Sequence, residues 1–145
     1  MKIIREITAG KTFIVRWPVL REGKPRESCR FEGDELPTTR HYGLFDEDDL
    51  AAVVSIFESN SQWFDDTKQI QLRGMAVLPA YRRRKYGDRL VKYSEAYAKR
   101  INATVIWFNA REIAVPFYEK CGYEIIGDWF DIGDIGKHYV MFKRL

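Results

Sequence analysis

The sequence predicts a single α/β domain with parallel strands in its second half. Residues 70–145 alternate strand-like and helix-like segments at the spacing that α/β proteins show. The pattern of residues 70–108 predicts a strand, a helix and a second strand, and hence a right-handed crossover between parallel strands. The chain has 145 residues, the length of one ordinary domain, and shows neither an internal repeat nor a linker rich in Ser and Gly.

Composition excludes several classes of protein. Hydrophobic residues make up 46% and charged residues 31%, and the formal net charge is only +3, so a polycation that coats nucleic acid is not expected. The longest apolar run, residues 50–57, is far shorter than the ~20 residues of a membrane span. Two distant cysteines, Cys29 and Cys121, indicate a reduced, cytoplasmic protein without a zinc site. We therefore expect no metal, no membrane and no nucleic-acid partner.

The first half is predicted to be irregular. Residues 3–7 fit a short strand or a helix start, and residues 13–20 fit a strand or a short helix that contains Pro18. Residues 21–40 are charged and rich in turn formers, which predicts a long loop of the kind that is usually functional or mobile. Residues 41–45 and 50–58 predict a hairpin.

The second half is more regular. Residues 70–78 predict a strand that Pro79 ends. The next predicted element is a helix over 88–102, because its apolar positions repeat with helical spacing. Residues 104–108 are β-branched and aromatic, as in a strand buried on both faces. A short helix over 113–121, with Pro116 in its first turn and Gly122 after its end, and strands over 123–130 and 138–145 complete the order.

The junction after the strand 70–78 predicts an anion site. Four consecutive cations, residues 82–85, precede the helix, whose first N–H groups and dipole favour negative charge. Arginine holds phosphate oxygens in a bidentate manner, and Gly87 lets a ligand approach the backbone closely. A solvated basic loop is the alternative, and the position at the helix start favours a phosphate site.

The stretch from Met75 to Leu90 resembles the acetyl-coenzyme A signature of the GNAT superfamily of N-acetyltransferases, Arg/Gln-x-x-Gly-x-Gly/Ala. Arg82 matches the first position and Gly87 the last. Lys85 stands where the family usually has its middle Gly, which permits close approach to the pyrophosphate. A Lys with ordinary helical angles would still offer its N–H.

Residues 109–123 resemble the closing motif of the same family, with Arg111 at the position of the usual Asn. The resemblance covers residues 70–145 well and residues 1–69 loosely. The matching residues of this motif are Ala114, Tyr118, Gly122 and Tyr123.

The resemblance implies a fold and a reaction. The fold is a mixed, mainly antiparallel central sheet with flanking helices, in which two parallel strands splay apart around the pantetheine arm of acetyl-CoA. The reaction is direct attack of an amine of a small molecule or peptide on the acetyl thioester. Tyr118 resembles the general acid of the family, which protonates the leaving thiolate.

The resemblance also implies which residues bind the coenzyme. Backbone groups of Met75, Ala76 and Val77 would pair with the pantetheine and supply an oxyanion donor. The following loop would hold the pyrophosphate. The full set of expected coenzyme-binding residues is Met75, Ala76, Val77, Arg82, Arg83, Arg84, Lys85, Tyr86, Gly87, Asp88, Asn109 and Phe117. Five aromatic residues are expected to surround the coenzyme groove, namely Trp107, Phe108, Phe117, Tyr118 and Tyr123.

The acceptor and the base are less defined. Many family members place a Glu on the strand before the phosphate loop, whereas this strand offers Gln71, Arg73 and Gly74. An acidic segment, residues 27–35, would suit a cationic acceptor, and the alternative is a mobile, solvated loop. The candidate bases are Glu27, Glu32, Asp34 and Glu35 of this segment, His41, and a chain of water molecules. The candidate substrate-binding residues are Glu32, Asp34 and His41.

Two other classes of function compete with an enzyme. A coenzyme-binding protein without catalysis would explain Lys85 and the missing base. An RNA-binding domain would explain the partial likeness of residues 73–77 to an RNA-recognition strand, but that strand lacks the aromatic residues that stack on bases. A homodimer is a further expectation, formed through exposed aromatic residues such as Trp63, Phe64, Trp129 or Phe130.

Overall fold

The computed structural model describes residues 1–145, apart from the side chain of residue 134. The chain forms two compact units. One comprises Met1–Phe57 and Leu72–Ser94, and the other comprises Glu58–Gln71 and Glu95–Leu145. The single-domain interpretation stays a prediction. In the part of the chain described, no helix is long and apolar enough to cross a lipid bilayer.

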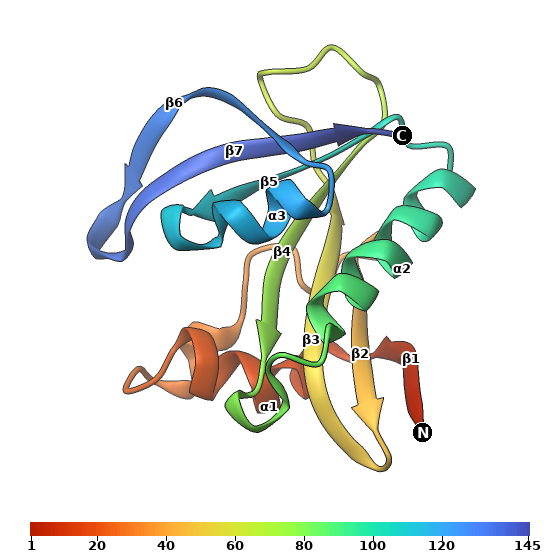
Figure 1. Ribbon diagram of the computed structural model, residues 1–145, viewed down its shortest axis with the longest axis vertical. Coiled ribbons are helices and arrows are strands. Elements are labelled where there is room, and N and C mark those ends of the chain that lie inside the picture. The colour runs from red at the N-terminus through yellow and green to blue at the C-terminus, as the bar shows by residue number, and fades with distance from the viewer. The chain divides into compact units, whose positions relative to one another are not determined.

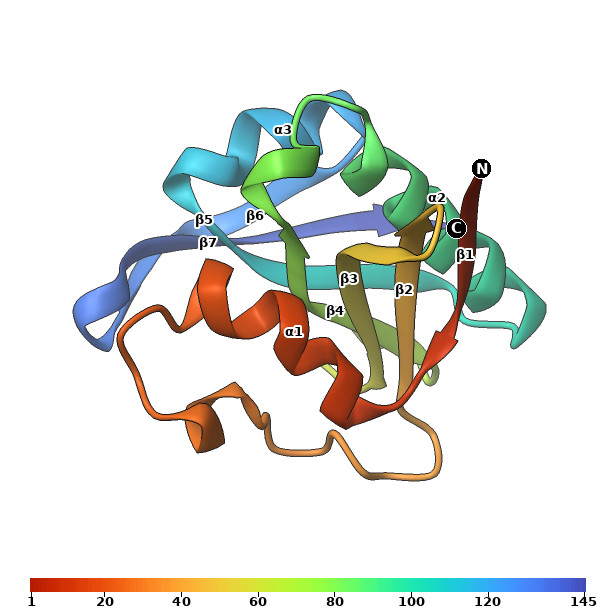
Figure 2. The same cartoon turned by 90° about the horizontal axis from the view of Figure 1, so that it is seen from below.

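The first unit contains a sheet with one long helix packed on it. β1, β2 and β3 are joined in antiparallel register, and Figure 1 shows β2 and β3 side by side as a hairpin. Val15 of α1 packs against Phe45, Val53 and Ala76 of the strands. Figure 2 shows α1 lying across one face of these strands. The main elements are β1 (Lys2–Ile7), α1 (Ala9–Leu20), β2 (Arg40–Asp46), β3 (Asp49–Glu58), most of β4 (Gln69–Val77) and the first part of α2 (Tyr86–Arg100).

In the second unit, the first residues of β4 form one strand of a sheet with β5, β7 and β6. Gln69–Gln71 of β4 pair in parallel with Val105–Trp107 of β5, and β7 pairs antiparallel with both β5 and β6. One core cluster of this unit contains Phe64, Trp107 and Val140. The elements that follow α2 are β5 (Val105–Arg111), α3 (Val115–Lys120), β6 (Glu124–Ile132) and β7 (Gly136–Arg144).

The strands follow the order β1-β2-β3-β4-β5-β7-β6 in a seven-stranded sheet. This arrangement confirms the mixed, mainly antiparallel sheet that the resemblance implies, and the crossover from β4 through α2 to β5 is parallel as predicted. Of the two alternatives predicted for residues 13–20, the structure shows the helix, as part of α1. Thr8 caps this helix by accepting a hydrogen bond from the Lys11 N–H.

Most boundaries differ from the prediction by a few residues, and two of these differences concern the predicted site. α2 begins at Tyr86, two residues before the predicted start. β5 continues to Arg111 instead of ending at residue 108, because pairing with β7 extends through Arg111 opposite His138. Asn109 therefore lies on a strand.

Candidate functional site

Gly74 lies within β4, just before the residues expected to pair with the pantetheine. Its φ is +66°, a conformation that side chains rarely adopt. A Cβ at this position would lie 2.9 Å from the Phe31 ring and 3.2 Å from Nε of Arg16. Glycine is therefore required here, both by the backbone angle and by the close approach of two side chains. Met75 and Val77, which follow, are half-buried, and Ala76 between them is buried.

Replacing Gly74 by Ala is expected to lower the free energy of unfolding by about 1–3 kcal/mol, through the left-handed angle and the overlap with Phe31. Gly10 in α1 is the matched control, because a Cβ there meets nothing within 4 Å. Gly10→Ala should raise stability by about 0.5–1 kcal/mol through helix propensity. Urea unfolding followed by circular dichroism measures both. Equal effects at the two positions would contradict the geometry at Gly74.

The basic loop before α2 has an unusual backbone. Arg83 and Lys85 have φ values of 64° and 63°, in the left-handed region that glycine enters most easily. The carbonyl of Lys85 accepts a hydrogen bond from the Arg89 N–H at 3.1 Å, at the start of α2. The expectation of ordinary helical angles at Lys85 is therefore wrong. The position keeps the backbone conformation that a glycine would adopt, although its side chain is that of lysine.

Substitution of Lys85 by Gly is expected to leave the free energy of unfolding within about 1 kcal/mol of its original value. Relief of the left-handed conformation offsets the entropy that Gly adds to the unfolded chain. Arg82, with φ −69°, serves as the control, because Arg82→Gly gains no such relief and also loses the exposed hydrogen bond from Nε to the Val77 carbonyl. It should lose about 1 kcal/mol or more. If chemical unfolding shows the same loss at both positions, Lys85 does not hold this conformation.

One carboxylate anchors the basic loop. Asp46, at the end of β2, pairs with Arg84 at 3.2 Å and accepts a hydrogen bond from the Tyr86 hydroxyl. The Tyr86 hydrogen bond is the main reason that the pKa of Asp46 lies below its usual value. Arg83 and Lys85 are exposed and have neither a hydrogen bond nor an ion pair from their side chains among the described residues. Arg84 is thus committed to the loop, whereas Arg83 and Lys85 remain available to an anion.

Tyr118 lies in a packed aromatic group of the second unit. Its ring centroid is 4.2 Å from that of Phe108 and 5.0 Å from that of Phe117. Burial raises the pKa of Tyr118 well above its ordinary value, so the phenol is protonated at neutral pH. Its hydroxyl has no hydrogen-bond partner within the described part of the chain. Tyr118 is therefore a proton donor without a committed acceptor.

Tyr123 differs from its neighbour Tyr118. The Tyr123 hydroxyl donates a hydrogen bond to Oε2 of Glu95 at 2.9 Å, and Lys143 pairs with the same carboxylate at 3.2 Å. Burial, followed by the nearby Glu95 charge, raises the pKa of Tyr123. Tyr123 therefore has a structural partner, whereas Tyr118 has none.

The other residues predicted near the coenzyme divide between two faces of β5. Phe108 contacts Tyr118 and Tyr123, whereas Trp107 belongs to the core cluster with Phe64, and its indole N–H donates to the Ser59 carbonyl at 2.8 Å. Successive side chains of a strand point to opposite faces, so Trp107 does not join the aromatic group of Tyr118. Phe64 is also buried, and its predicted place on an exposed dimer face is wrong. Trp63 and Trp129 are exposed as expected, whereas Phe130 is half-buried against the core cluster of Phe64. Asn109 and Phe117 are exposed.

The acidic segment before β2 is held by a buried ion pair. Arg16 of α1 and Asp34, both with fully buried side chains, form an ion pair in which Nη1 lies 2.7 Å from Oδ2. Asp34 also accepts the Phe31 N–H, and Nη2 of Arg16 donates to the Ser55 hydroxyl at 2.8 Å. Nδ1 of His41 lies 2.6 Å from the same hydroxyl. The structure thus places Asp34 and His41 in a buried network rather than on a surface open to a substrate.

Of the remaining acidic residues, only Glu35 forms an ion pair among the described residues. Glu35 pairs with Arg30 at 2.8 Å, while Glu27 and Glu32 are exposed. Sequence reasoning missed Arg16, although a single cation inside the apolar run of residues 12–20 is a usable signal. The missed residue determines how the whole segment is held.

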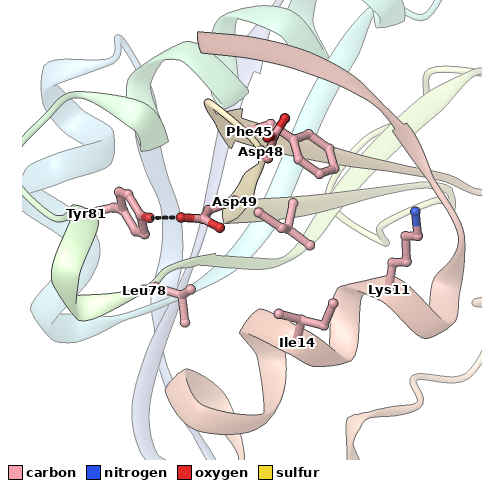
Figure 3. A pocket seen from close by; sticks show the side chains of 8 residues that line it. Lys11, Ile14, Phe45, Asp48, Asp49, Leu78 and Tyr81 are labelled. Atoms are coloured by element: carbon pink, nitrogen blue, oxygen red, sulfur yellow. Dashed lines mark hydrogen bonds between the residues drawn. The ribbon is translucent and has the colours of Figure 1, made fainter. Parts of the chain in front are cut away.

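A separate cavity of about 390 Å³ lies in the first unit. Figure 3 shows Lys11 and Ile14 of α1 on one side, and Asp49 hydrogen-bonded to the Tyr81 hydroxyl on the other. None of the residues predicted to bind the coenzyme or the acceptor lines it. The predicted coenzyme-binding and acceptor-binding residues thus lie outside the lining of this cavity.

Comparisons with known proteins agree with the motifs. A family model described as the acetyltransferase (GNAT) family matches residues 6–123. An uncharacterized N-acetyltransferase of Bacillus subtilis (strain 168), YitI, is 31% identical over 142 residues, which cover 98% of this chain and 95% of that protein.

Solved structures share the fold at lower identity. A putative N-acetyltransferase from Lactobacillus plantarum has a TM-score of 0.80 at 18% identity, covering 99% of this chain and 98% of its own. An aminoglycoside 6'-N-acetyltransferase complexed with coenzyme A has a TM-score of 0.77 at 18% identity, with 98% and 96% covered.

Proposed function

The chain belongs to the acetyltransferase (GNAT) family, and on this premise we propose that it transfers the acetyl group of acetyl-CoA to a primary amine of a small molecule or peptide. The amine attacks the thioester directly while both substrates are bound. The observation that carries the proposal is the loop before α2, where Lys85 keeps a left-handed backbone and exposed cations lie at the helix start. Such a loop suits a pyrophosphate.

The coenzyme is assigned to the first unit's strand and loop. Backbone groups of Met75–Val77 pair with the pantetheine arm, and an N–H of this stretch stabilises the negative charge that develops on the thioester oxygen. Arg82, Arg83 and Lys85 bind the phosphates, and Arg84 supports the loop through Asp46. Asn109 and Phe117, both exposed, are assigned to the coenzyme as well.

The proton for the leaving thiolate is assigned to Tyr118. Its phenol is protonated at neutral pH and has no competing acceptor among the described residues. Burial makes a phenol a weaker acid, but a dry site raises the pKa of the leaving thiol as well. Donor and acceptor therefore remain matched, which is the condition for efficient general acid catalysis.

No carboxylate of β4 is available as a base. Asp34 is engaged with Arg16, and Glu35 is paired with Arg30. We assign proton removal from the amine to water. Within the segment 27–35, Glu32 is an exposed acidic side chain. Acetyl transfer is then expected to depend on the fraction of acceptor that is already neutral.

Calorimetry with acetyl-CoA, followed by free-thiol release with a library of amines, tests the proposal. Binding heat together with thiol release supports it, and binding without release from any amine would favour the inactive coenzyme-binding alternative. Absence of binding heat at high protein concentration would refute both. Arg82→Ala should weaken acetyl-CoA binding by about tenfold, and more at low salt. Arg5→Ala, which removes an exposed cation of β1 that is not part of the basic loop, is the control.

A further inference from the structure

Arg73 of β4 is a half-buried cation to which no carboxylate is hydrogen-bonded among the described residues. Its guanidinium carbon lies 5.0 Å from the Phe31 ring centroid and 5.1 Å from that of Phe57. Its single hydrogen bond among the described residues is a long one, 3.4 Å from Nη1 to the Glu32 carbonyl. The half-buried side chain therefore keeps most of its five N–H donors unused, although two aromatic rings fix its position.

The surroundings of Arg73 carry excess positive charge. Three guanidinium groups lie near the Phe31 ring, those of Arg16 at 3.8 Å, Arg21 at 5.3 Å and Arg73 at 5.0 Å. The one carboxylate buried among them, Asp34, is bound to Arg16. Arg21 donates only to the carbonyls of Ser28 and Leu20. Arg21 and Arg73 thus form no direct ion pair among the described residues, and the charges of Asp34 and Glu32 act on Arg73 only without a hydrogen bond. An anion bound directly to these half-buried guanidinium groups would offset the cost of their burial.

Arg73 lies directly beside the residues of β4 that the proposed function assigns to the coenzyme. It directly precedes Gly74 and the stretch Met75–Val77, which the proposed function assigns to the acetyl-bearing arm of the coenzyme. It touches Phe31 and Glu32 of the segment 27–35, which contains the candidate substrate-binding residues Glu32 and Asp34. The guanidinium therefore lies where the strand proposed to bind the coenzyme meets this candidate acceptor segment. Burial lowers the pKa of Arg73, consistent with a guanidinium that lacks full solvation.

We propose that Arg73 binds a carboxylate of the acceptor, so that the substrate is an amine that also carries a carboxylate, as an amino acid does. This inference rests on the proposed function and specifies its substrate class. A planar guanidinium held between two rings matches the two oxygens of a carboxylate in a bidentate contact. The charge of the site is opposite to the one expected from the acidic residues of the segment 27–35.

Acetyl transfer to paired acceptors tests the proposal. The probes are the standard L-amino acids, their carboxamides, and O-phosphoethanolamine, each assayed by thiol release from acetyl-CoA. Because conversion of the carboxylate to an amide lowers the pKa of the neighbouring amine, kcat/KM is compared per neutral amine. On that scale, acceptors with a free carboxylate should exceed their amides by at least about tenfold. Arg73→Gln should remove this preference by raising KM for the acids alone, and Arg73→Lys should restore part of it. Amides that react as well as acids, or a preference for the phosphate compound, would overturn the proposal.

Two controls separate a binding role from a structural one. Arg5→Gln removes another guanidinium that lies over a phenylalanine ring, 4.3 Å from the Phe45 centroid, and should leave the preference intact. The affinity for acetyl-CoA should be the same in Arg73→Gln as in the original protein. A loss of coenzyme affinity, or an equal loss of rate for acids and amides, would show that Arg73 acts on the fold and not on the acceptor.

A second readout does not require catalysis. Saturation-transfer NMR in the presence of coenzyme A compares N-acetylamino acids with N-acetylamino amides. Signals from the acids alone, lost in Arg73→Gln, would establish the carboxylate site even if no amine releases thiol, and the proposed function would then fail separately. Equal signals from acids and amides, or no signal from either, would overturn the carboxylate site.

Discussion

Replacement of Tyr118 by Phe is expected to lower kcat for acetyl transfer by about 100-fold or more, the usual contribution of a positioned general acid. The change removes one hydroxyl, which has no hydrogen-bond partner among the described residues, so the packing against Phe108 and Phe117 is preserved. The affinity for acetyl-CoA should stay the same. Single-turnover thiol release measures the rate, and calorimetry measures the affinity.

Tyr123→Phe is the matched control for Tyr118→Phe. It also removes one buried phenolic hydroxyl from the same aromatic group, but that hydroxyl donates to Glu95. The control should lower the free energy of unfolding by about 1–3 kcal/mol, because an acceptor loses its donor, and should leave kcat within a few fold. A normal rate in Tyr118→Phe would remove Tyr118 from the acid role.

The pH dependence offers an independent check on Tyr118. Because burial raises its pKa above the ordinary value of about 10, the phenol remains a donor throughout the neutral and mildly alkaline range. The rate should therefore rise with pH as the acceptor amine loses its proton, without a fall below about pH 10 that depends on Tyr118. A decline near pH 8 that disappears in Tyr118→Phe would contradict this assignment.

Replacement of Asp34 by Ala is expected to lower the free energy of unfolding by about 3–5 kcal/mol, because it leaves the charge of Arg16 buried without a partner. Both side chains of this pair are 0% exposed. The loss is a large fraction of the stability of an ordinary domain. Urea unfolding, followed by circular dichroism, measures the change.

The exposed pair of Arg30 and Glu35 is the matched control. These side chains are 56% and 69% exposed, so Glu35→Gln should cost less than about 1 kcal/mol. If Asp34→Ala does not fold, the double variant Arg16→Met with Asp34→Leu decides the matter, since replacing both charges by apolar groups is close to neutral. An unstable double variant would mean that the hydrogen bonds of Arg16 and Asp34 with their other partners, and not the unpaired charge, account for the loss.

Local pattern was sufficient for most of the fold. The helical spacing of Leu90, Ser94 and Ala98 identified α2, and these three residues are fully buried. β-Branched and aromatic residues identified β5 up to residue 108. Its extension to Arg111 has no such local signal, because it depends on pairing with β7, a strand far along the chain.

The site could be predicted in part, for the same reason. The basic loop and Tyr118 stand in contiguous motifs that local sequence reveals. Asp34 looked like one acidic residue among several, and its buried partner Arg16 lies on a helix whose existence was itself uncertain from sequence. The net charge of a sequence segment does not predict the charge of the folded site when another element places an opposite charge beside it, as α1 does with Arg16. The left-handed conformation of Lys85 could not be predicted from the local sequence, because lysine rarely adopts it.

Asp46 restricts how this sequence can change over evolution. Its carboxylate at the end of β2 holds both Arg84 of the basic loop and Tyr86 of α2, so the hairpin and the loop are not independent positions. Relatives that lose this acid should also lose the arginine or the tyrosine, whereas changes at exposed Arg83 should show no such correlation. The hairpin turn, which lies far from the loop in sequence, is thus expected to co-vary with it.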